Sequence, residues 1–251
     1  MAEAAATAAR YTTAELMATV IAREVRDGET VAVGTLAPLP ATGVLLAHLG
    51  RAPRARVVIM GHPDYWPFRS GSKEFYDFAQ RGGIDLFFLS GGQIDRRGNL
   101  NLVAVGDPAQ PRVRLPGGAG AATLSYVARR VVVFRTEHTP RIFVERVDFV
   151  TSPGPPPPGV ARAGGPDTVV TPLCVFRFDR AHQALRVASV HPGVGRDTLA
   201  ARTGFPLEYE AGAGATPEPT DAELALLRTR VREAVARAYP EYAATALGGP
   251  A

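Results

Sequence analysis

The sequence is poor in the residues that mark exported or metal-binding proteins. Its 251 residues include a single cysteine, Cys174, and five dispersed histidines. One cysteine cannot form an internal disulfide, so nothing points to an oxidising compartment. No His/Cys spacing suits a metal ion, and we expect neither a metal nor a tightly bound cofactor.

Lysine is nearly absent too, since Lys73 is the only lysine among 28 Lys and Arg residues. The formal charge is +4 and the pI about 9.6. The arginines are scattered in pairs such as Arg96-Arg97, without the long basic run or aromatic-interleaved stripe of nucleic-acid binders. We therefore expect no nucleic-acid partner and favour an anionic small ligand.

Signals for export or membrane insertion are also lacking. Charged residues interrupt the alanine-rich segment 1–25, namely Glu3, Arg10, Glu15 and Arg23. Residues 30–50 lack Asp, Glu, Lys and Arg over a length that could span a bilayer. Glycines and prolines divide this stretch into strand, loop and helix: Gly34, Pro38, Pro40 and Gly43. We predict a buried core segment, no membrane partner and a cytoplasmic location.

What is present indicates an α/β fold. Hydrophobic residues make up 46% of the chain and charged residues 21%, so a sizeable core can form. Continuous apolar runs predict strands at 30–33, 57–60, 84–90 and 131–135. Helical patterns predict helices at 13–27, 40–49, 73–80 and 121–128. This alternation predicts a largely parallel sheet flanked by helices.

The chain changes character after residue 150. Residues 151–168 are rich in proline and glycine and form a linker or a surface loop. Residues 169–251 predict a β-hairpin with its turn at 180–183 and a helix over 221–238 that Thr220 and Glu223 cap. We expect this small C-terminal part to pack on the core formed by residues 1–150.

Two glycine-containing stretches are candidates for binding. LPGGAGAATL at 115–124 places Gly117, Gly118 and Gly120 directly before a helix, where several backbone N–H groups can converge on a phosphate or an oxyanion. The alternative is a glycine turn between strand and helix. In GGQIDRRGNLN at 91–101, Asn99 and Asn101 are turn-formers or, less commonly, ligands.

These two stretches belong to a longer series of motifs that also includes GDPAQPRVR, VDFVTSPG and the late HPGV and TGF. In the order and spacing of these motifs, the chain resembles the β subunit of glutaconate CoA-transferase and its relatives. The resemblance covers most of the chain. It implies a CoA-transferase-type fold, an α-type partner subunit and an acyl-CoA site at the subunit interface, with coenzyme A thioester as substrate. It places Gly117, Gly118, Ala119 and Gly120 at the oxyanion and CoA, and Gly91, Gly92, Gln93, Asn99 and Asn101 in the substrate pocket.

One position departs from the family pattern. The resemblance implies a β-subunit glutamate that attacks the thioester and forms a glutamyl-CoA intermediate. The matching run here is VVIMGH, and Met60 occupies the glutamate's position. Methionine has no oxygen nucleophile. His62 is a candidate acid-base group because histidine titrates near neutrality, and the alternative is a loop-packing histidine.

Some members of the family also lack this glutamate, and they hydrolyse cyclic CoA esters from steroid degradation or decarboxylate a glutaconyl-type CoA ester. We therefore predict a β-type subunit of a heteromeric enzyme that hydrolyses or decarboxylates the acyl part of a dicarboxylic or keto acyl-CoA. Two alternatives stay open. The partner subunit supplies the carboxylate of an ordinary transferase, or this chain is a non-catalytic subunit that binds acyl-CoA or stabilises its partner.

Overall fold

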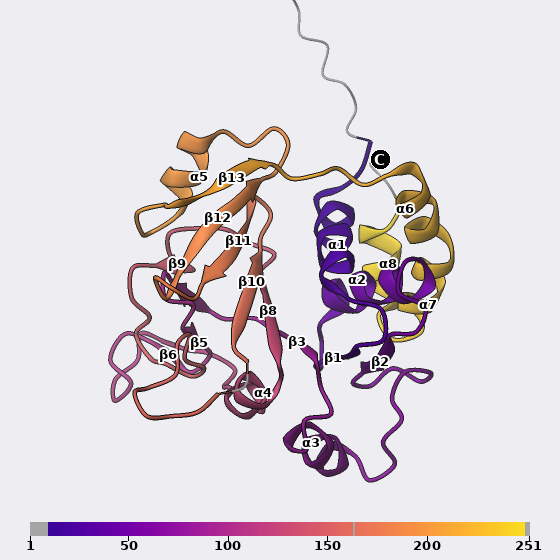
Figure 1. The fold of residues 1–251 in the computed structure, drawn as a ribbon, viewed down its shortest axis with the longest axis horizontal. Helices are drawn as coiled ribbons and strands as arrows, with labels where there is room; N and C mark the ends of the chain where they lie inside the picture. Colours follow the sequence, from indigo (N-terminus) through magenta and orange to yellow (C-terminus); the bar gives the residue numbers. More distant parts are fainter. Residues whose placement is uncertain (1–9, 163, 249–251) are drawn as a thin grey trace, which may run out of the picture.

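The computed structural model describes residues 10–162 and 164–248, and an eight-stranded sheet runs through its centre (Figure 1). Its order is β13-β12-β11-β10-β8-β3-β1-β2. The strands are β1 (Thr30–Val33), β2 (Arg56–Ile59), β3 (Leu86–Leu89), β8 (Arg130–Phe134), β10 (Pro166–Val170), β11 (Cys174–Asp179), β12 (Ala184–Val190) and β13 (Tyr209–Ala215). Strands β2, β1, β3, β8 and β10 are parallel. The predicted largely parallel sheet is confirmed.

Helices cover both faces of this sheet. They are α1 (Thr13–Glu24), α2 (Pro38–Leu49), α3 (Ser72–Gln80), α4 (Ala121–Val127), α5 (Arg196–Arg202), α6 (Asp221–Leu226), α7 (Arg232–Ala236) and α8 (Pro240–Ala246). Helix α1 ends at Glu24 rather than at residue 27, because Val25 adopts an extended conformation. The helix predicted over 221–238 consists of α6, a π-helical stretch (Leu227–Val231) and α7.

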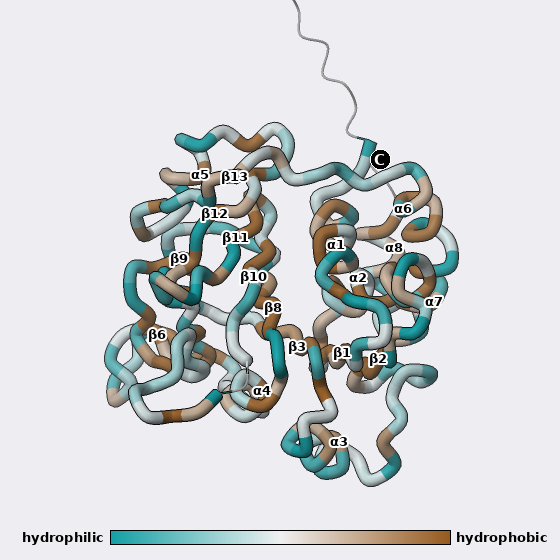
Figure 2. The backbone as a smooth tube through the Cα atoms, in the orientation of Figure 1, coloured by the Kyte–Doolittle hydropathy of each residue, from teal (hydrophilic) through white to brown (hydrophobic). Residues whose placement is uncertain are grey.

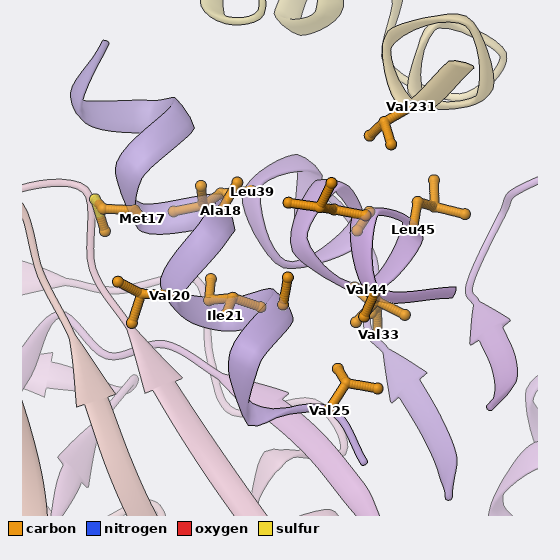
Figure 3. Packing of buried hydrophobic residues seen from close by; sticks show 14 of the residues in the cluster. Met17, Ala18, Val20, Ile21, Val25, Val33, Leu39, Val44, Leu45 and Val231 are labelled. Atoms are coloured by element: carbon orange, nitrogen blue, oxygen red, sulfur yellow. The ribbon is translucent and has the colours of Figure 1, made fainter. Parts of the chain in front are cut away.

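One face of the sheet packs against α1, α2 and the C-terminal helices. Met17 and Ile21 of α1, Leu45 of α2 and Val231 are all buried in this layer (Figure 3). In β1, Val31 and Val33 belong to this layer, whereas Ala32 belongs to the other. Figure 2 shows hydrophobic residues along the central strands and within these helices. The central strands β1, β3 and β8 are therefore buried on both faces, as their continuous apolar sequences predict.

The other face carries α3, α4 and two small sheets. One small sheet is β5-β4-β9, with β4 (Gln93–Asp95), β5 (Leu100–Asn101) and β9 (Phe143–Val144). The other pairs β6 (Ala104–Val105) with β7 (Val113–Arg114). Three fully buried phenylalanines fill this layer: Phe75, Phe143 and Phe176.

The segment after residue 165 extends the main sheet. Strand β10 pairs with β8, and β11 and β12 form the predicted hairpin with residues 180–183 between them. In the proline-rich segment, the guanidinium of Arg162 donates to the carbonyl oxygens of Pro153 and Gly154, both at 2.7 Å. The division at residues 150 and 168 stays a prediction.

Within the described residues, no helix combines the length and apolarity needed to cross a membrane. Across residues 10–162 and 164–248, no three or more His, Cys, Asp or Glu side chains are grouped so as to hold a metal ion. Cys174 is buried, and burial raises the pKa of its thiol to about 12. The thiol is therefore unreactive at neutral pH.

Candidate functional site

The carboxyl end of β2 presents Met60 beside the end of β1. Val33 pairs with Ile59, and the Met60 backbone N–H donates to the Val33 carbonyl at 3.0 Å. The Thr35 hydroxyl donates to the Met60 Sδ at 2.9 Å. In parallel α/β sheets the carboxyl edge is where ligands bind, so Met60 occupies a position suited to a reacting group.

Leu36 follows Thr35 in the loop between β1 and α2. Its φ is +54°, a conformation that leucine rarely adopts, and its side chain is 85% exposed. Such strain costs roughly 1–3 kcal/mol and is concentrated at functional sites. An exposed apolar side chain therefore stands one residue from the Met60 contact.

His62 makes the contacts of a packing residue. It is 1% exposed, its Nδ1 accepts from the Asp64 backbone N–H at 3.1 Å, and its Nε2 lies 2.9 Å from the Ala234 carbonyl. Because a carbonyl oxygen only accepts, the Nε2 donates to it, and both ring nitrogens are therefore occupied by hydrogen bonds. Its ring also packs edge-on against Tyr65. This geometry favours the loop-packing alternative over an acid-base role.

Aromatic side chains connect the loop after Met60 to α3. The rings of Trp66 and Phe68 lie 5.0 Å apart, and each packs against Phe75 of α3. On the same helix, Tyr76 lies against Gly120, where an added Cβ would come within 1.9 Å of the Tyr76 hydroxyl oxygen. Helix α3 thus joins the two regions predicted to form the site, namely the Met60 loop and the glycine loop.

In the glycine loop at 117–120, three backbone N–H groups are available as hydrogen-bond donors to a ligand. The Gly117 N–H donates to Leu102, and the Ala121 N–H donates to the Gly118 carbonyl. The N–H groups of residues 118–120 donate no hydrogen bond within the described part of the chain. Positive φ values at Gly117 (+97°) and Ala119 (+40°) shape the turn. Such a loop can donate to an oxyanion.

The stretch GGQIDRRGNLN forms an internal hydrogen-bond network. The Gln93 Oε1 accepts from the Asn101 amide at 2.7 Å, and the Gln93 Nε2 donates to Asp148 at 3.0 Å. The Asp95 carboxylate accepts from the Asn99 backbone and side chain. These side chains hold the small sheet together, and a role in the substrate pocket stays a prediction.

Two glycines in this stretch make close contacts. A Cβ at Gly92 would lie 2.6 Å from a methyl carbon of Leu115, and one at Gly91 would lie 2.8 Å from the Gln93 carbonyl. A side chain is therefore excluded at Gly91 by a backbone atom, whereas at Gly92 the obstructing atom is the end of a leucine side chain, which can move.

Two buried histidines, His138 and His191, both contact Thr171, and the sequence alone did not predict that they lie close together. His138 contacts the hydroxyls of Thr171 and Thr203 at 2.9 and 3.0 Å, while His191 contacts the Thr216 hydroxyl and the Thr171 carbonyl. Burial, the main cause for each, lowers the pKa of His138 and of His191 from 6.5 to about 4. His138 lies between β8 and β9 and His191 directly after β12, and no sequence signal relates the two.

Comparison with known proteins gives the family context. The Coenzyme A transferase family signature matches residues 64–202. The chain is 31% identical to the B-type subunit of 3-oxoadipate CoA-transferase from Pseudomonas knackmussii, over 87% of this chain and 92% of that protein. It is 35% identical to the IpdB subunit of the cholesterol ring-cleaving hydrolase from Rhodococcus jostii, over 65% of this chain and 64% of that subunit.

Solved structures of coenzyme A transferases and related enzymes have the same fold as this chain. Glutaconate coenzyme A-transferase from Acidaminococcus fermentans superposes with a TM-score of 0.77 at 25% identity, covering 87% of this chain and 94% of that one. The decarboxylase AibA/AibB superposes with a TM-score of 0.74 at 26% identity, covering 95% and 99%. The predicted CoA-transferase-type fold is confirmed.

Proposed function

Because the chain belongs to the coenzyme A transferase family as a B-type subunit, we propose that it forms, with an α-type partner, an enzyme that acts on the acyl part of a CoA thioester without a glutamyl intermediate. The reaction is hydrolysis or decarboxylation, and the substrate is a dicarboxylic or keto acyl-CoA. The family resemblance predicted from the sequence is confirmed.

Met60 carries the proposal. It stands at the carboxyl end of β2, where the resemblance places the family's nucleophilic glutamate, and its thioether accepts a hydrogen bond from Thr35. A thioether cannot form an acyl anhydride or a thioester, so the Met60 side chain cannot exchange CoA through a covalent intermediate. In this proposal the acyl part of the CoA thioester reacts with water or loses carbon dioxide instead.

The glycine loop supports the same reading. Its unused N–H groups at residues 118–120 can donate to the thioester oxygen as negative charge develops there. Donors of this kind stabilise an enolate or an oxyanion without a protein nucleophile. In this proposal the loop binds and polarises the thioester, and the acid-base groups are water or side chains of the partner subunit.

Two similar proteins have names that fit this chemistry. IpdB is a subunit of a ring-cleaving hydrolase, and AibA/AibB is a decarboxylase. The similarity to 3-oxoadipate CoA-transferase instead supports ordinary exchange, with the carboxylate supplied by the partner. Transferase chemistry is thus the second candidate.

The need for an acceptor acid distinguishes these candidates. The complex of this chain with its partner would be incubated with acyl-CoA thioesters of dicarboxylic and keto acids, with and without a free acceptor carboxylate. We expect the acyl part to be consumed without the acceptor, giving a hydrolysed or decarboxylated product. Turnover that depends on the acceptor and produces its CoA ester would overturn the proposal. A complex that binds the thioester without turnover would support the non-catalytic alternative.

A further inference from the structure

A cleft of about 900 Å³ lies away from Met60, at the opposite edge of the sheet. Its residues come from the β4–β5 turn, the loop after β9, the proline-rich segment and the β11–β12 turn. The β4–β5 turn lies at the amino-terminal edge because Gly98 packs against Pro166, the first residue of β10. Met60 follows the carboxyl end of β2, which is parallel to β10 through the intervening strands.

Three arginines from two segments line this cleft. Arg96 is paired with Glu208, whereas the only side-chain hydrogen bond of Arg97 within the described residues is a donation to the neutral Gln183 amide oxygen at 3.2 Å. Arg146 makes no ion pair or side-chain hydrogen bond within the described residues. Two exposed guanidinium groups without a carboxylate partner therefore face one concave surface, and guanidinium groups bind phosphate through paired N–H donors.

Two acids, Asp95 and Glu145, also line the cleft, and among the described residues neither forms an ion pair with Arg97 or Arg146. Asp95 is 2% exposed, and its carboxylate accepts from the backbone N–H groups of Arg97 and Asn99 and from the Asn99 side chain. Glu145 is exposed and directly precedes Arg146 in the sequence. His182 lines the cleft as well, and its Nδ1 lies 2.7 Å from the Asp179 carboxylate.

The part of the lining that comes from the proline-rich segment, here called the proline wall, is apolar and lies beside Arg97. Pro155, Pro156, Pro157 and Pro158 line it, together with Val150, which is 49% exposed. Gly154 fixes the wall in place, because its N–H donates to the Asn99 side chain and a Cβ there would lie 1.7 Å from the Arg97 carbonyl oxygen. Apolar proline rings in the same lining as these two guanidinium groups suit a planar base that carries phosphates, because the C–H groups of the rings can pack against the face of the base.

We propose that this cleft is a second binding site, separate from the acyl-CoA reaction site, for an adenosine phosphate. The phosphates lie between Arg97 and Arg146, and the base packs against Pro155–Pro158. The ligand is either a free adenine nucleotide or the nucleotide end of a coenzyme A molecule. The inference does not depend on which reaction the Met60 edge supports.

Calorimetric titration of the complex of this chain with its partner tests the site, using ADP at low ionic strength. The double variant Arg97→Gln/Arg146→Gln should weaken ADP binding roughly tenfold or more, because two charge-assisted contacts are lost. Arg81→Gln is the matched control, since Arg81 is also exposed and lies outside the cleft. Equal melting temperatures would establish that the variants are folded. Absence of ADP binding, or equal affinity in the double variant, would overturn the proposal.

Further titrants define the ligand class. Inorganic pyrophosphate should bind more weakly than ADP, and equal affinity would refute the role of the proline wall. Coenzyme A that competes with ADP, together with a raised KM for acyl-CoA in the double variant, would identify the coenzyme's nucleotide end as the ligand. ADP binding that leaves the KM unchanged would identify a free nucleotide.

Discussion

Gly43 of α2 and Ile21 of α1 are in such close contact that a Cβ on Gly43 would lie 2.4 Å from the Ile21 Cγ2 atom. The Ala18 carbonyl oxygen would be 2.8 Å from the same Cβ. Because this oxygen belongs to the helix backbone, it cannot move aside as a side chain can. Alanine favours a helix over glycine by about 1 kcal/mol, but overpacking a core costs roughly 1–3 kcal/mol. We therefore expect Gly43→Ala to lower the melting temperature of the complex by about 2 °C or more.

Gly212→Ala is the control for this substitution. Gly212 lies in β13, and a Cβ added there would have no atom within 4 Å, so the methyl group meets open space. Its melting temperature should match that of the wild type. A Gly43→Ala complex that melts at or above the wild-type temperature would show that the two helices can separate without cost.

The buried histidines predict how stability depends on pH. The folded chain holds His138 and His191 neutral, because burial lowers the pKa of each to about 4 from 6.5. Unfolded histidines bind protons below about pH 6.5, so stability is fully present above that pH and is lost as the pH falls toward 4. The melting temperature should decline across this range, and His191→Gln should reduce the slope. A curve that stays flat between pH 6.5 and 4 would contradict the neutral assignment.

Local signals predicted the helix starts well. Thr220 and Glu223 form the expected capping box, and Thr12 and Glu15 form one at the start of α1. Such contacts can be predicted because they span only three residues of chain. Both ends of each of the four central strands were predicted to within two residues, because buried parallel strands have continuous apolar sequences. The π-helical stretch at Leu227–Val231 had no such signal.

Tertiary contacts limited what could be predicted of the site. The motif containing Gln93 and Asn101 resembles a ligand-binding pattern, but its partner Asp148 lies on a distant segment, so only the structure shows the hydrogen bonds between them. The role of His62 was equally ambiguous in the sequence, because the contact of its Nε2 with the Ala234 carbonyl of α7 is visible only in the structure. Met60 was identifiable from the sequence only through the family resemblance, which implies a glutamate at this position.

Gly118 tests the glycine loop as an acyl-CoA site. A Cβ there would lie 2.5 Å from the Thr151 Cγ2 methyl, so loss of binding in Gly118→Ala could reflect a displaced loop. Thr151→Ser removes that methyl and keeps the hydroxyl that accepts from the Leu102 N–H. We expect acyl-CoA affinity, measured by calorimetry, to stay reduced in Gly118→Ala/Thr151→Ser, since the Cβ still obstructs the ligand. Full recovery in the double variant would assign Gly118 a packing role only.

The need for a partner subunit is a separate prediction. Exposed apolar side chains include Leu36 at 85% and Val113 at 47%, and subunits of stable heteromers bury such surface against each other. We expect the chain to be poorly soluble or unstable alone and to co-purify with an α-type subunit, which raises its melting temperature. A monodisperse, folded monomer at micromolar concentration, with no gain in melting temperature on adding the partner, would contradict this.

The most direct test of the proposed function is a search for a covalent acyl-CoA adduct on this chain. The complex would be incubated with acyl-CoA, trapped with borohydride or hydroxylamine and analysed by mass spectrometry. Because Met60 cannot form a glutamyl thioester, no modified carboxylate should be found within residues 57–68. Met60→Glu restores the carboxylate and should give a trapped adduct if the side chain is correctly placed, since an error of about 1 Å can cost a hundredfold in rate. CoA exchange by the wild-type complex, with an adduct on Asp64 or another acid of this chain, would contradict the account.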